Sequence, residues 1–218
     1  MTNRDLKLII SIPFNQTFAI KIKDMESIND RFNASFQFKL PAWLETHESS
    51  WSPTTNLEKQ TQYVINLAEK NVRDETGGPF AAAIFEIESG QLISTGLNLV
   101  VANNNSMLHA EVVAIMRAEN RLGRYSLNDN KQSLRLVSSC EPCAMCLGAI
   151  FWSGLKRVAS AAERQDAESC GFDEGPVFDA TYQYLNTHGI EFTHGILRED
   201  AQTVFKLYLE TQGDIYNP

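Results

Sequence analysis

The sequence lacks any run of apolar residues long enough to cross a membrane. The apolar stretch at its start, Leu8–Ile12, is ended by Pro13 and is far shorter than the roughly 20 residues that a transmembrane helix needs. No small-residue cleavage site follows this stretch, so we expect neither a membrane partner nor a targeting segment. The absence of both predicts a cytoplasmic protein.

Basic residues and cysteines are also few. The chain has 19 Lys and Arg against 27 Asp and Glu, for a net charge of −8, and its basic residues are scattered along the sequence. This distribution argues against a polyanionic partner such as a nucleic acid and favours a small-molecule substrate. Three of the four cysteines lie within residues 140–146, which is not the spacing of a secreted disulfide framework and favours a reducing compartment.

The length of 218 residues, with 43% hydrophobic residues, is enough for one domain with some elaboration. We expect residues 1–51 to form an N-terminal extension that packs on the core and residues 52–218 to form the main domain. Short strands are predicted in the extension at Leu6–Ile12, Phe18–Ile22 and Phe36–Leu40, and the polar stretch Glu45–Thr55 is predicted to be a link.

Hydrophobic periodicity predicts an alternation of helices and strands after this link. The order strand, helix, strand in the second half predicts parallel pairing and a sheet covered on both faces. The predicted elements are a helix from Leu57 ended by Gly77-Gly78-Pro79, a hairpin of Phe80–Ile87 and Gln91–Val101, a helix at Leu108–Arg121, strands at Leu134–Ser138, Val158–Ala162 and Ile190–Ile196, and helices at Pro142–Ser153 and Glu199–Thr211.

Two short motifs carry the chemistry of the chain: His109-Ala110-Glu111 and Pro142-Cys143-Ala144-Met145-Cys146. Two thiolates and one imidazole are typical zinc ligands, and a set of only three leaves a fourth position for a water molecule. Zinc in such a site makes that water a nucleophile near neutral pH. We therefore expect one catalytic Zn²⁺ per chain, held by His109, Cys143 and Cys146.

The spacing within each motif assigns the roles. Cys143 and Cys146 share one face of a helix, and Pro142 favours a helix start there, where the partial positive charge stabilises thiolates. Glu111 lies two residues after His109, so the two side chains diverge on a helix and Glu111 can reach the bound water. We interpret Glu111 as the general acid and base, not as a ligand.

Cys140 supports an alternative interpretation. Together with Cys143, Cys146 and His109 it could complete a four-ligand structural zinc site, and the chain would then be a zinc-stabilised binding protein without enzymatic activity. Cys140 ends a predicted strand, before the helix that carries the other two cysteines. We therefore expect its thiol to point away from them.

The pattern H-x-E…P-C-x-x-C is the signature of zinc-dependent nucleobase deaminases. From about Leu57 to Glu174 the sequence resembles the cytidine and deoxycytidylate deaminase superfamily, and within it most closely the bacterial guanine deaminases. The stretches that carry this resemblance are Gly77–Phe80, Ser138–Ile150, Trp152 and Gly171–Glu174. The resemblance implies a three-layer α/β/α sandwich around a five-stranded mixed sheet, and a homodimer.

The resemblance also implies roles for individual residues. Asn98 would donate to O6 or N7 of a purine, and Glu174 would accept from its N1–H and amino group. Tyr216 would belong to a C-terminal tail that closes the site. Apart from the resemblance, backbone N–H groups near Ala110 and at the start of the Cys143 helix are expected to stabilise the charge that develops in the reaction. Phe80 and Trp152 match pocket positions, although both suit plain core packing, Glu174 also suits a solvated loop, and the tail also suits a frayed terminus.

These assignments predict hydrolysis of guanine to xanthine and ammonia. Glu111 would take a proton from the zinc-bound water and pass it to a ring nitrogen while the water attacks C2. Other amino-heterocycles, such as cytosine, a nucleoside or an s-triazine, differ by only one or two hydrogen bonds and stay open as substrates. A tRNA adenosine deaminase uses the same motif, but it would need basic residues to hold a polyanion, and the acidic composition disfavours this.

Overall fold

The computed structural model describes residues 37–129 and 132–217. The strands predicted at Leu6–Ile12 and Phe18–Ile22 lie outside the described residues, and residues 37–40 form no strand. Residues from Leu40 onward make one compact unit, which includes the short helix α2 (Leu44–Ser49). The division into an extension of residues 1–51 and a catalytic domain stays a prediction.

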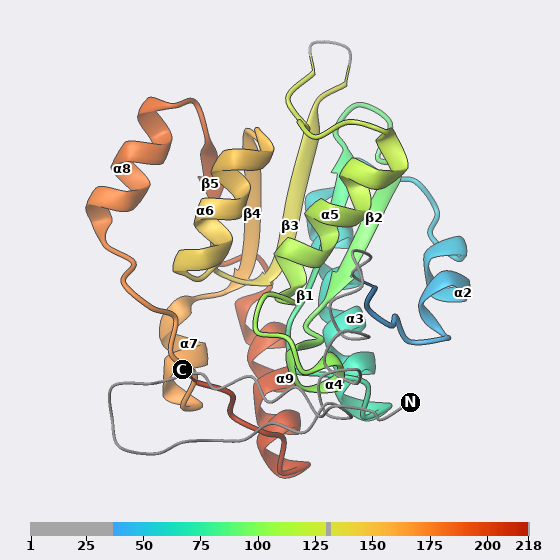
Figure 1. Ribbon diagram of the computed structural model, residues 1–218, viewed down its shortest axis with the longest axis vertical. Coiled ribbons are helices and arrows are strands. Elements are labelled where there is room, and N and C mark those ends of the chain that lie inside the picture. The colour runs from blue at the N-terminus through green and yellow to red at the C-terminus, as the bar shows by residue number, and fades with distance from the viewer. Residues whose placement is uncertain (1–36, 130–131, 218) are drawn as a thin grey trace, which may run out of the picture. The chain divides into compact units, whose positions relative to one another are not determined.

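A mixed sheet of five strands, in the order β2-β1-β3-β4-β5, forms the centre of the described unit (Figure 1). β1 pairs antiparallel with both β2 and β3, whereas β4 pairs parallel with both β3 and β5. The predicted hairpin and the predicted parallel pairing are both confirmed. The strand bounds are Ala81–Glu86 for β1, Leu92–Leu97 for β2, Leu134–Cys140 for β3, Arg157–Ala162 for β4 and Glu191–Thr193 for β5.

Helices cover both faces of this sheet, which confirms the three-layer α/β/α architecture (Figure 1). One layer contains α3 (Leu57–Arg73) and α9 (Arg198–Glu210), which pack against each other and against β4. The other layer contains α5 (Ala110–Leu122) and α6 (Ala144–Ser153). α5 contacts β1, β2 and α6, so the starts of α5 and α6 lie close together.

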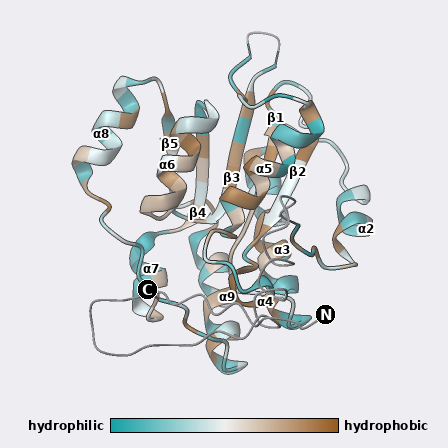
Figure 2. Ribbon diagram, in the orientation of Figure 1, coloured by the Kyte–Doolittle hydropathy of each residue, from teal (hydrophilic) through white to brown (hydrophobic). Residues whose placement is uncertain are grey.

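The central strands are apolar because helices cover them on both sides. Five of the six residues of β1 are buried, from Ala81 to Phe85, and Figure 2 shows hydrophobic colour along the central strands and hydrophilic colour on outward-facing turns of the helices. Gly96 on β2 allows α5 to approach closely, since a Cβ atom there would lie 1.9 Å from the Ala110 carbonyl oxygen. The absence of a side chain at Gly96 therefore allows the start of α5 to pack directly against β2.

The structure differs from the sequence-based prediction in its short helices. The polar link contains α2, and the residues predicted to extend β2 instead form one helical turn, α4 (Val100–Asn103). Two more helices, α7 (Arg164–Ser169) and α8 (Asp179–Thr187), were not predicted. α2, α7 and α8 each bury a single residue and α4 buries none, so they have no apolar period to detect. Among the described residues, no helix is both long and apolar enough to span a membrane.

Candidate active site

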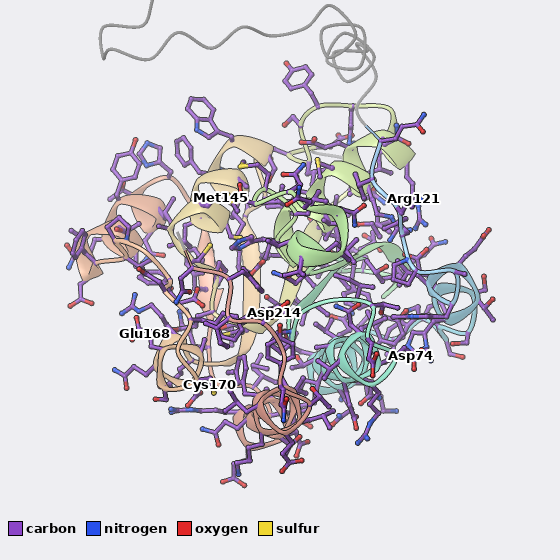
Figure 3. The ribbon with its side chains drawn as sticks, turned by 60° about the horizontal axis from the view of Figure 1, so that its bottom comes forward. Asp74, Arg121, Met145, Glu168, Cys170 and Asp214 are labelled. Atoms are coloured by element: carbon purple, nitrogen blue, oxygen red, sulfur yellow. The ribbon has the colours of Figure 1, made fainter. Side chains whose placement is uncertain are left out.

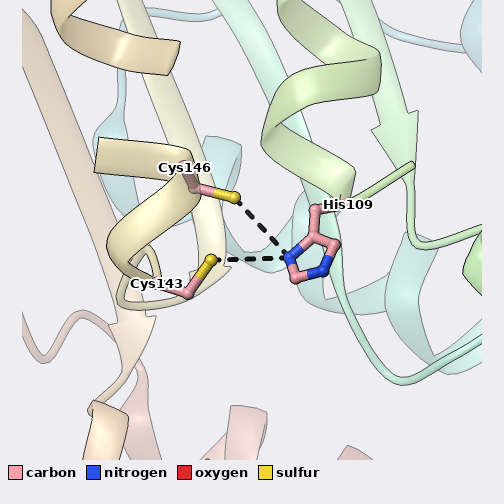
Figure 4. A group of neighbouring side chains, drawn as sticks. All are labelled: His109, Cys143 and Cys146. Carbon is pink, nitrogen blue, oxygen red and sulfur yellow. Dashed lines mark hydrogen bonds between the residues drawn. The ribbon is translucent and has the colours of Figure 1, made fainter. Parts of the chain in front are cut away.

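The three predicted zinc ligands meet at the starts of two neighbouring helices. His109 immediately precedes α5, Cys143 immediately precedes α6, and Cys146 lies in the first turn of α6. The Nδ1 atom of His109 is 3.5 Å from Cys143 Sγ and 3.7 Å from Cys146 Sγ (Figure 4). Among the described residues, these three form the group of His, Cys, Asp and Glu side chains that could hold a metal ion, with ligand atoms all within 4.8 Å of one another.

This geometry fits a tetrahedral zinc ion. Zn–S and Zn–N bonds of about 2.3 and 2.0 Å, at tetrahedral angles, place sulfur and nitrogen roughly 3.6 Å apart, close to both measured separations. The donor set is also prepared for a cation, because hydrogen bonds from Cys146 and His109 lower the pKa of the Cys143 thiol to about 4. The described residues therefore supply three zinc ligands, as expected from the sequence.

Cys140 lies outside this group. Its buried Sγ atom donates to the backbone carbonyl of Glu163 at 3.6 Å, at the end of β3. Burial raises the pKa of its thiol well above the ordinary value, which disfavours the thiolate that binds a metal. The four-ligand structural site that would include Cys140 is not the arrangement in the described part of the chain.

Glu111 lies beside the ligands without belonging to their group. Its Oε1 accepts from Ser138 Oγ at 3.0 Å, and its Oε2 accepts from the Cys146 thiol at 3.3 Å. Burial, reinforced by the charge of Cys143, raises the pKa of Glu111 above its ordinary value. A buried carboxylate with a raised pKa, close to the metal ligands, can both accept and return a proton.

A cavity of about 260 Å³ opens at this site, near the lower end of the range of roughly 300–1,000 Å³ typical of ligand pockets. Its described lining contains three carboxylates and no Lys or Arg. The lining residues are Phe80, Asn98, Ser106, His109, Ala110, Glu111, Cys143, Ala144, Met145, Cys146, Phe172, Asp173, Glu174, Gly175 and Tyr216. The cavity is therefore small and acidic.

Asn98 and Phe80 come from the end of the hairpin. Asn98 follows β2 directly and is 1% exposed, and its Oδ1 accepts from Val100 N at 3.4 Å. The opposite end of this side-chain amide, Nδ2, is then the group that can donate to a ligand. Phe80 precedes β1, and its ring packs edge-on against Phe172 and Phe205, so it belongs both to the core and to the cavity wall.

Glu174 reaches the cavity from the loop between α7 and α8. Its backbone oxygen accepts from Ala144 N at 3.0 Å, which attaches this loop to the start of α6. The Ala144 N–H is thus already used and is not available to the reacting atoms. Burial, together with the charges of Cys143 and Glu111, raises the pKa of Glu174 to about 8.

Tyr216 enters the cavity from the C-terminal tail. Figure 3 shows the tail at Asp214 leaving α9 and crossing this end of the unit. The ring of Tyr216 lies 6.3 Å from that of His109 and 5.4 Å from that of Phe172, and its buried hydroxyl has no hydrogen-bond partner among the residues that the structure describes. A buried hydroxyl without a partner in a ligand-sized cavity is suited to donate to a ligand.

The structure does not bring Trp152 to this cavity. Its side chain is 82% exposed on the outer face of α6 and is absent from the lining, so within one chain it neither packs in the core nor forms a pocket wall. Phe172 and Met145 line the cavity but had no predicted role, although both lie inside the motifs that carried the resemblance. Ser138 also lies in such a motif, and only its contact with Glu111 reveals a function for it.

The model of the cytidine and deoxycytidylate deaminase zinc-binding region matches residues 54–162. This segment contains both zinc-ligand motifs in the spacing described above. The chain belongs to this family. Membership makes it a zinc-dependent hydrolase that acts on amino groups of cyclic amidines.

Several family members are similar over most of the described unit. Guanine deaminase from Bacillus subtilis (strain 168) is 42% identical over 123 residues, which are 56% of this chain and 75% of that protein. The solved structure of guanine deaminase from Nitrosomonas europaea is 37% identical, with a TM-score of 0.77 over 81% of this chain and 97% of that one. A variant structure in complex with 8-azaguanine is 37% identical, with a TM-score of 0.77 over 81% and 98%. Relatives named tRNA-specific adenosine deaminases are more distant, at 25–31% identity.

Proposed function

We propose that this deaminase hydrolyses guanine to xanthine and ammonia. The observation that carries the proposal is the cavity, where a three-residue zinc-ligand set, a buried carboxylate outside that set and hydrogen-bonding groups for a purine edge share one small space. The relatives named guanine deaminases, at 42% and 37% identity, support it.

Recognition of the base is assigned to residues of the cavity lining other than the metal ligands. Asn98 donates from Nδ2 to O6 or N7, the acceptors on that edge of guanine. Glu174 accepts from N1–H and from the 2-amino group, which adenine does not offer as a pair because its N1 is an acceptor. Phe80 and Phe172 cover the apolar faces of the ring, and Tyr216 donates its hydroxyl to the bound base.

Proton transfer is assigned to Glu111. Zinc, when bound by His109, Cys143 and Cys146, supplies the Lewis acidity that makes water a nucleophile near neutral pH. Glu111 takes one proton from the attacking water and passes it to a ring nitrogen, while Ser138 holds Oε1 and fixes the direction of the carboxylate. The C2–O bond forms and the C2–N bond breaks. One proton of the water stays on the ring nitrogen of xanthine, and the other joins the two amino hydrogens in the ammonia that leaves.

The backbone N–H of Ala110, at the start of α5, is assigned to stabilise the charge that develops during attack. Ala110 is fully buried and lines the cavity, where the partial positive charge of a helix start is least screened. Glu174 relays the last proton to the leaving amine.

The charges around the cavity disfavour phosphate-bearing substrates. The described lining contains Glu111, Asp173 and Glu174 but no Lys or Arg, whereas a tRNA substrate requires cations that follow its backbone. A volume of about 260 Å³ also favours a single free base. Cytosine, nucleosides and s-triazines stay open as alternative substrates, and the test compares them with guanine.

The test is release of ammonia from guanine, guanosine, adenine, cytosine and an aminated s-triazine by the purified zinc-loaded protein. We expect guanine to give the highest kcat/KM and xanthine as the product. A higher kcat/KM for any other compound, or no turnover of guanine, would overturn the proposal. A short tRNA anticodon stem-loop in the same series tests the nucleic-acid alternative.

We also propose that the protein is a homodimer and that the outer face of α6 is the contact surface. This face includes Gly148, Ala149 and Trp152 and has no charged residue, and part of α6 is coloured towards hydrophobic (Figure 2). Trp152 is 82% exposed, and a Cβ atom at Gly148 would meet nothing within 4 Å, so a second helix can approach closely. A helix apolar on all sides is normally buried. Sedimentation should show a dimer for the natural chain and a monomer for Trp152→Glu.

We place the protein in the cytoplasm, in the breakdown of purine bases. The two thiolate ligands require cysteines that stay reduced, and all four cysteines of the chain are free, which suits a reducing compartment. Cell fractionation, with guanine-dependent ammonia release as the marker, tests this location.

A further inference from the structure

Asn71 lies on α3, in the helix layer away from the zinc-ligand helices, and is 0% exposed. We propose that Asn71 is a positioning residue, which holds the backbone of Asn98 and so aims its side chain at the substrate. The proposal rests on the role given above to Asn98. No part of the mechanism uses Asn71 itself, and its side chain contacts no residue of the cavity lining except through the Asn98 backbone.

The amide of Asn71 uses both of its donors on the segments that border the cavity. Its Nδ2 donates to the Gly78 carbonyl at 2.9 Å and to the Asn98 carbonyl at 3.1 Å. Its Oδ1 accepts from Thr76 Oγ1 at 2.8 Å. One side chain therefore joins the loop before β1 to the residue after β2, at the point where both leave the sheet.

The two joined segments also bond to each other. Gly78 N donates to the Asn98 carbonyl at 3.1 Å, and Asn98 N donates to the Phe80 carbonyl at 2.9 Å. The Asn98 carbonyl thus accepts two hydrogen bonds, one of them from Asn71, and both lie outside the β1–β2 ladder. This pairing explains why β2 ends at Leu97, short of the predicted Val101.

The space between these groups is filled completely. A Cβ atom at Gly77 would lie 2.1 Å from the Asn98 carbonyl oxygen and 2.6 Å from Asn71 Nδ2. Gly77 has no positive φ, so any residue could adopt its backbone conformation, and only the close approach excludes a side chain. We call the two hydrogen bonds from Asn71 Nδ2 to the Gly78 and Asn98 carbonyls the clamp. Because the space is filled, the clamp tolerates little displacement of Asn98 while Asn71 is in place.

Chemistry requires an amide at position 71. Two carbonyl oxygens need donors, and a buried carbonyl that loses its partner is destabilised. A carboxylate in the same place would present oxygen to oxygen. Displacement of a substrate-orienting group by about 1 Å can lower the rate by roughly 100-fold, so loss of the clamp is expected to be visible in turnover before it is visible in folding.

The test is a double-mutant cycle of Asn71→Ala and Asn98→Ala, measured as kcat/KM for guanine with zinc content determined for each variant. We expect Asn71→Ala alone to lower kcat/KM by about 10- to 100-fold, and to change it less than about threefold when Asn98 is already Ala, because interacting residues are not additive. An equal loss in both backgrounds would overturn the proposal.

Gln60→Ala is the matched control. Gln60 lies on the same helix, is also 0% exposed, and donates from its side-chain amide to the Thr54 carbonyl at 2.8 Å, away from the cavity. We expect it to lower the melting temperature without changing kcat/KM. A loss of activity equal to that of Asn71→Ala would show that general destabilisation, not positioning, explains the effect.

A second measurement does not depend on the substrate. In the ligand-free protein, the Asn98 side-chain NH₂ resonances, assigned by their loss in Asn98→Ala, should shift in Asn71→Ala and stay in place in Gln60→Ala. Unmoved Asn98 resonances in Asn71→Ala would overturn the positioning role even if guanine is turned over. Shifted resonances in a protein that does not deaminate guanine would support the clamp and overturn only the proposed substrate.

Gly77→Ala provides a variant that keeps the Asn71 amide. Because its Cβ atom would enter the space between Asn71 and the Asn98 carbonyl, we expect it to reproduce both the kinetic loss and the shift of the Asn98 resonances. Native kcat/KM and unmoved resonances in Gly77→Ala would contradict the clamp.

Discussion

The two halves of the cavity are built from the chain in different ways. The zinc half takes His109, Cys143 and Cys146 from the starts of two packed helices, so the backbone of α5 and α6 fixes each ligand. The base-facing half takes Asn98, Glu174 and Tyr216 from three separate loops or tails. In the zinc half, the same local arrangement, a ligand at the start of a helix, occurs twice. The base-facing half depends on contacts between distant segments.

Each residue of the base-facing half is held by a hydrogen bond from elsewhere. Asn71 holds Asn98, and Ala144 N holds the backbone of Glu174. The tail is held by Asn217, whose Oδ1 accepts from Asp173 N at 2.9 Å and whose Nδ2 donates to the Gly171 carbonyl at 2.7 Å. The metal ligands are therefore positioned by the local backbone at two helix starts. The residues assigned to substrate recognition are positioned by single hydrogen bonds from distant segments.

The largest effect is expected from breaking the zinc half. Cys143→Ser removes a thiolate whose pKa of about 4 favours metal binding, so zinc content and activity should both be lost. Cys140→Ser, which changes a cysteine of the same motif outside the ligand group, should keep both. Metal analysis with an activity assay measures this, and loss of zinc in Cys140→Ser would restore the four-ligand structural interpretation.

Glu111→Gln separates metal binding from proton transfer within the same half. The amide keeps the size of the side chain and lies outside the ligand group, so zinc should stay bound. Turnover should fall because the variant cannot accept a proton, by about 10²- to 10⁴-fold in kcat. Native turnover in a zinc-loaded Glu111→Gln protein would remove Glu111 from the mechanism.

In the base-facing half, Glu174→Gln should act on one substrate more than on another. The variant replaces the carboxyl group that is proposed to accept from N1–H and the 2-amino group of guanine, so kcat/KM for guanine should fall about 10- to 100-fold. 2-Aminopurine, which has no N1–H, should lose less, and the preference for guanine should shrink. Glu168→Gln, an acid on α7 outside the cavity lining, serves as the control. Equal losses for both purines would contradict the contact to N1–H.

The sequence predicts the fold wherever an element buries a periodic apolar face. All five strands of the described sheet and the four helices of its two outer layers were predicted, with ends shifted by a few residues. Two strands are clearly too long in the prediction: β5, which is only Glu191–Thr193, and β2, which ends at Leu97, next to the residue whose carbonyl bonds to Asn71. Helices such as α8, whose single buried residue is Leu185, are stabilised by neighbours that no local pattern reveals.

The candidate site follows the same division. Residue types and spacing were enough to predict that His109, Cys143 and Cys146 form one ligand set, because the backbone at a helix start has a defined conformation. Asn98 and Glu174 needed the resemblance to known deaminases, since nothing in their local sequence distinguishes them from loop residues. Trp152 shows the limit: its place on α6 was correct, but the direction of its side chain depends on packing that only the structure provides.

Tyr216→Phe tests the base-facing half with the removal of one oxygen atom. Its hydroxyl is buried without a partner, so if it donates to the bound base the variant should raise KM for guanine by about 2- to 10-fold, the value of one neutral hydrogen bond. The melting temperature should rise or stay constant, because an unpaired polar atom is removed. An unchanged KM would show that Tyr216 acts only through its ring.

The smallest effect on catalysis is expected at the far side of α5, where α2 joins the sheet. Glu48 is paired with Arg117 at 2.7 Å and Arg121 at 2.5 Å, and it also accepts from Thr95. Burial acts to raise the pKa of Glu48, but these hydrogen bonds outweigh it and hold the pKa below its ordinary value of 4.5. A carboxylate with a lowered pKa contributes stability above the unfolded-state value and loses it as the pH falls through the folded-state value.

Glu48→Gln should therefore lower the free energy of unfolding at pH 7 by about 1 to 2 kcal/mol, and the difference from the natural chain should be smaller at an acidic pH below the lowered folded-state pKa of Glu48, where the carboxyl is protonated in both states. Glu69→Gln, which breaks the exposed pair of Glu69 with Arg73, should cost less than about 0.5 kcal/mol. Urea unfolding at both pH values measures these differences. Because Arg117 and Arg121 lie in the second half of α5, whereas His109 precedes its first residue, kcat should stay native in both variants. A fall in kcat for Glu48→Gln would show that the zinc half depends on distant contacts as much as the base-facing half does.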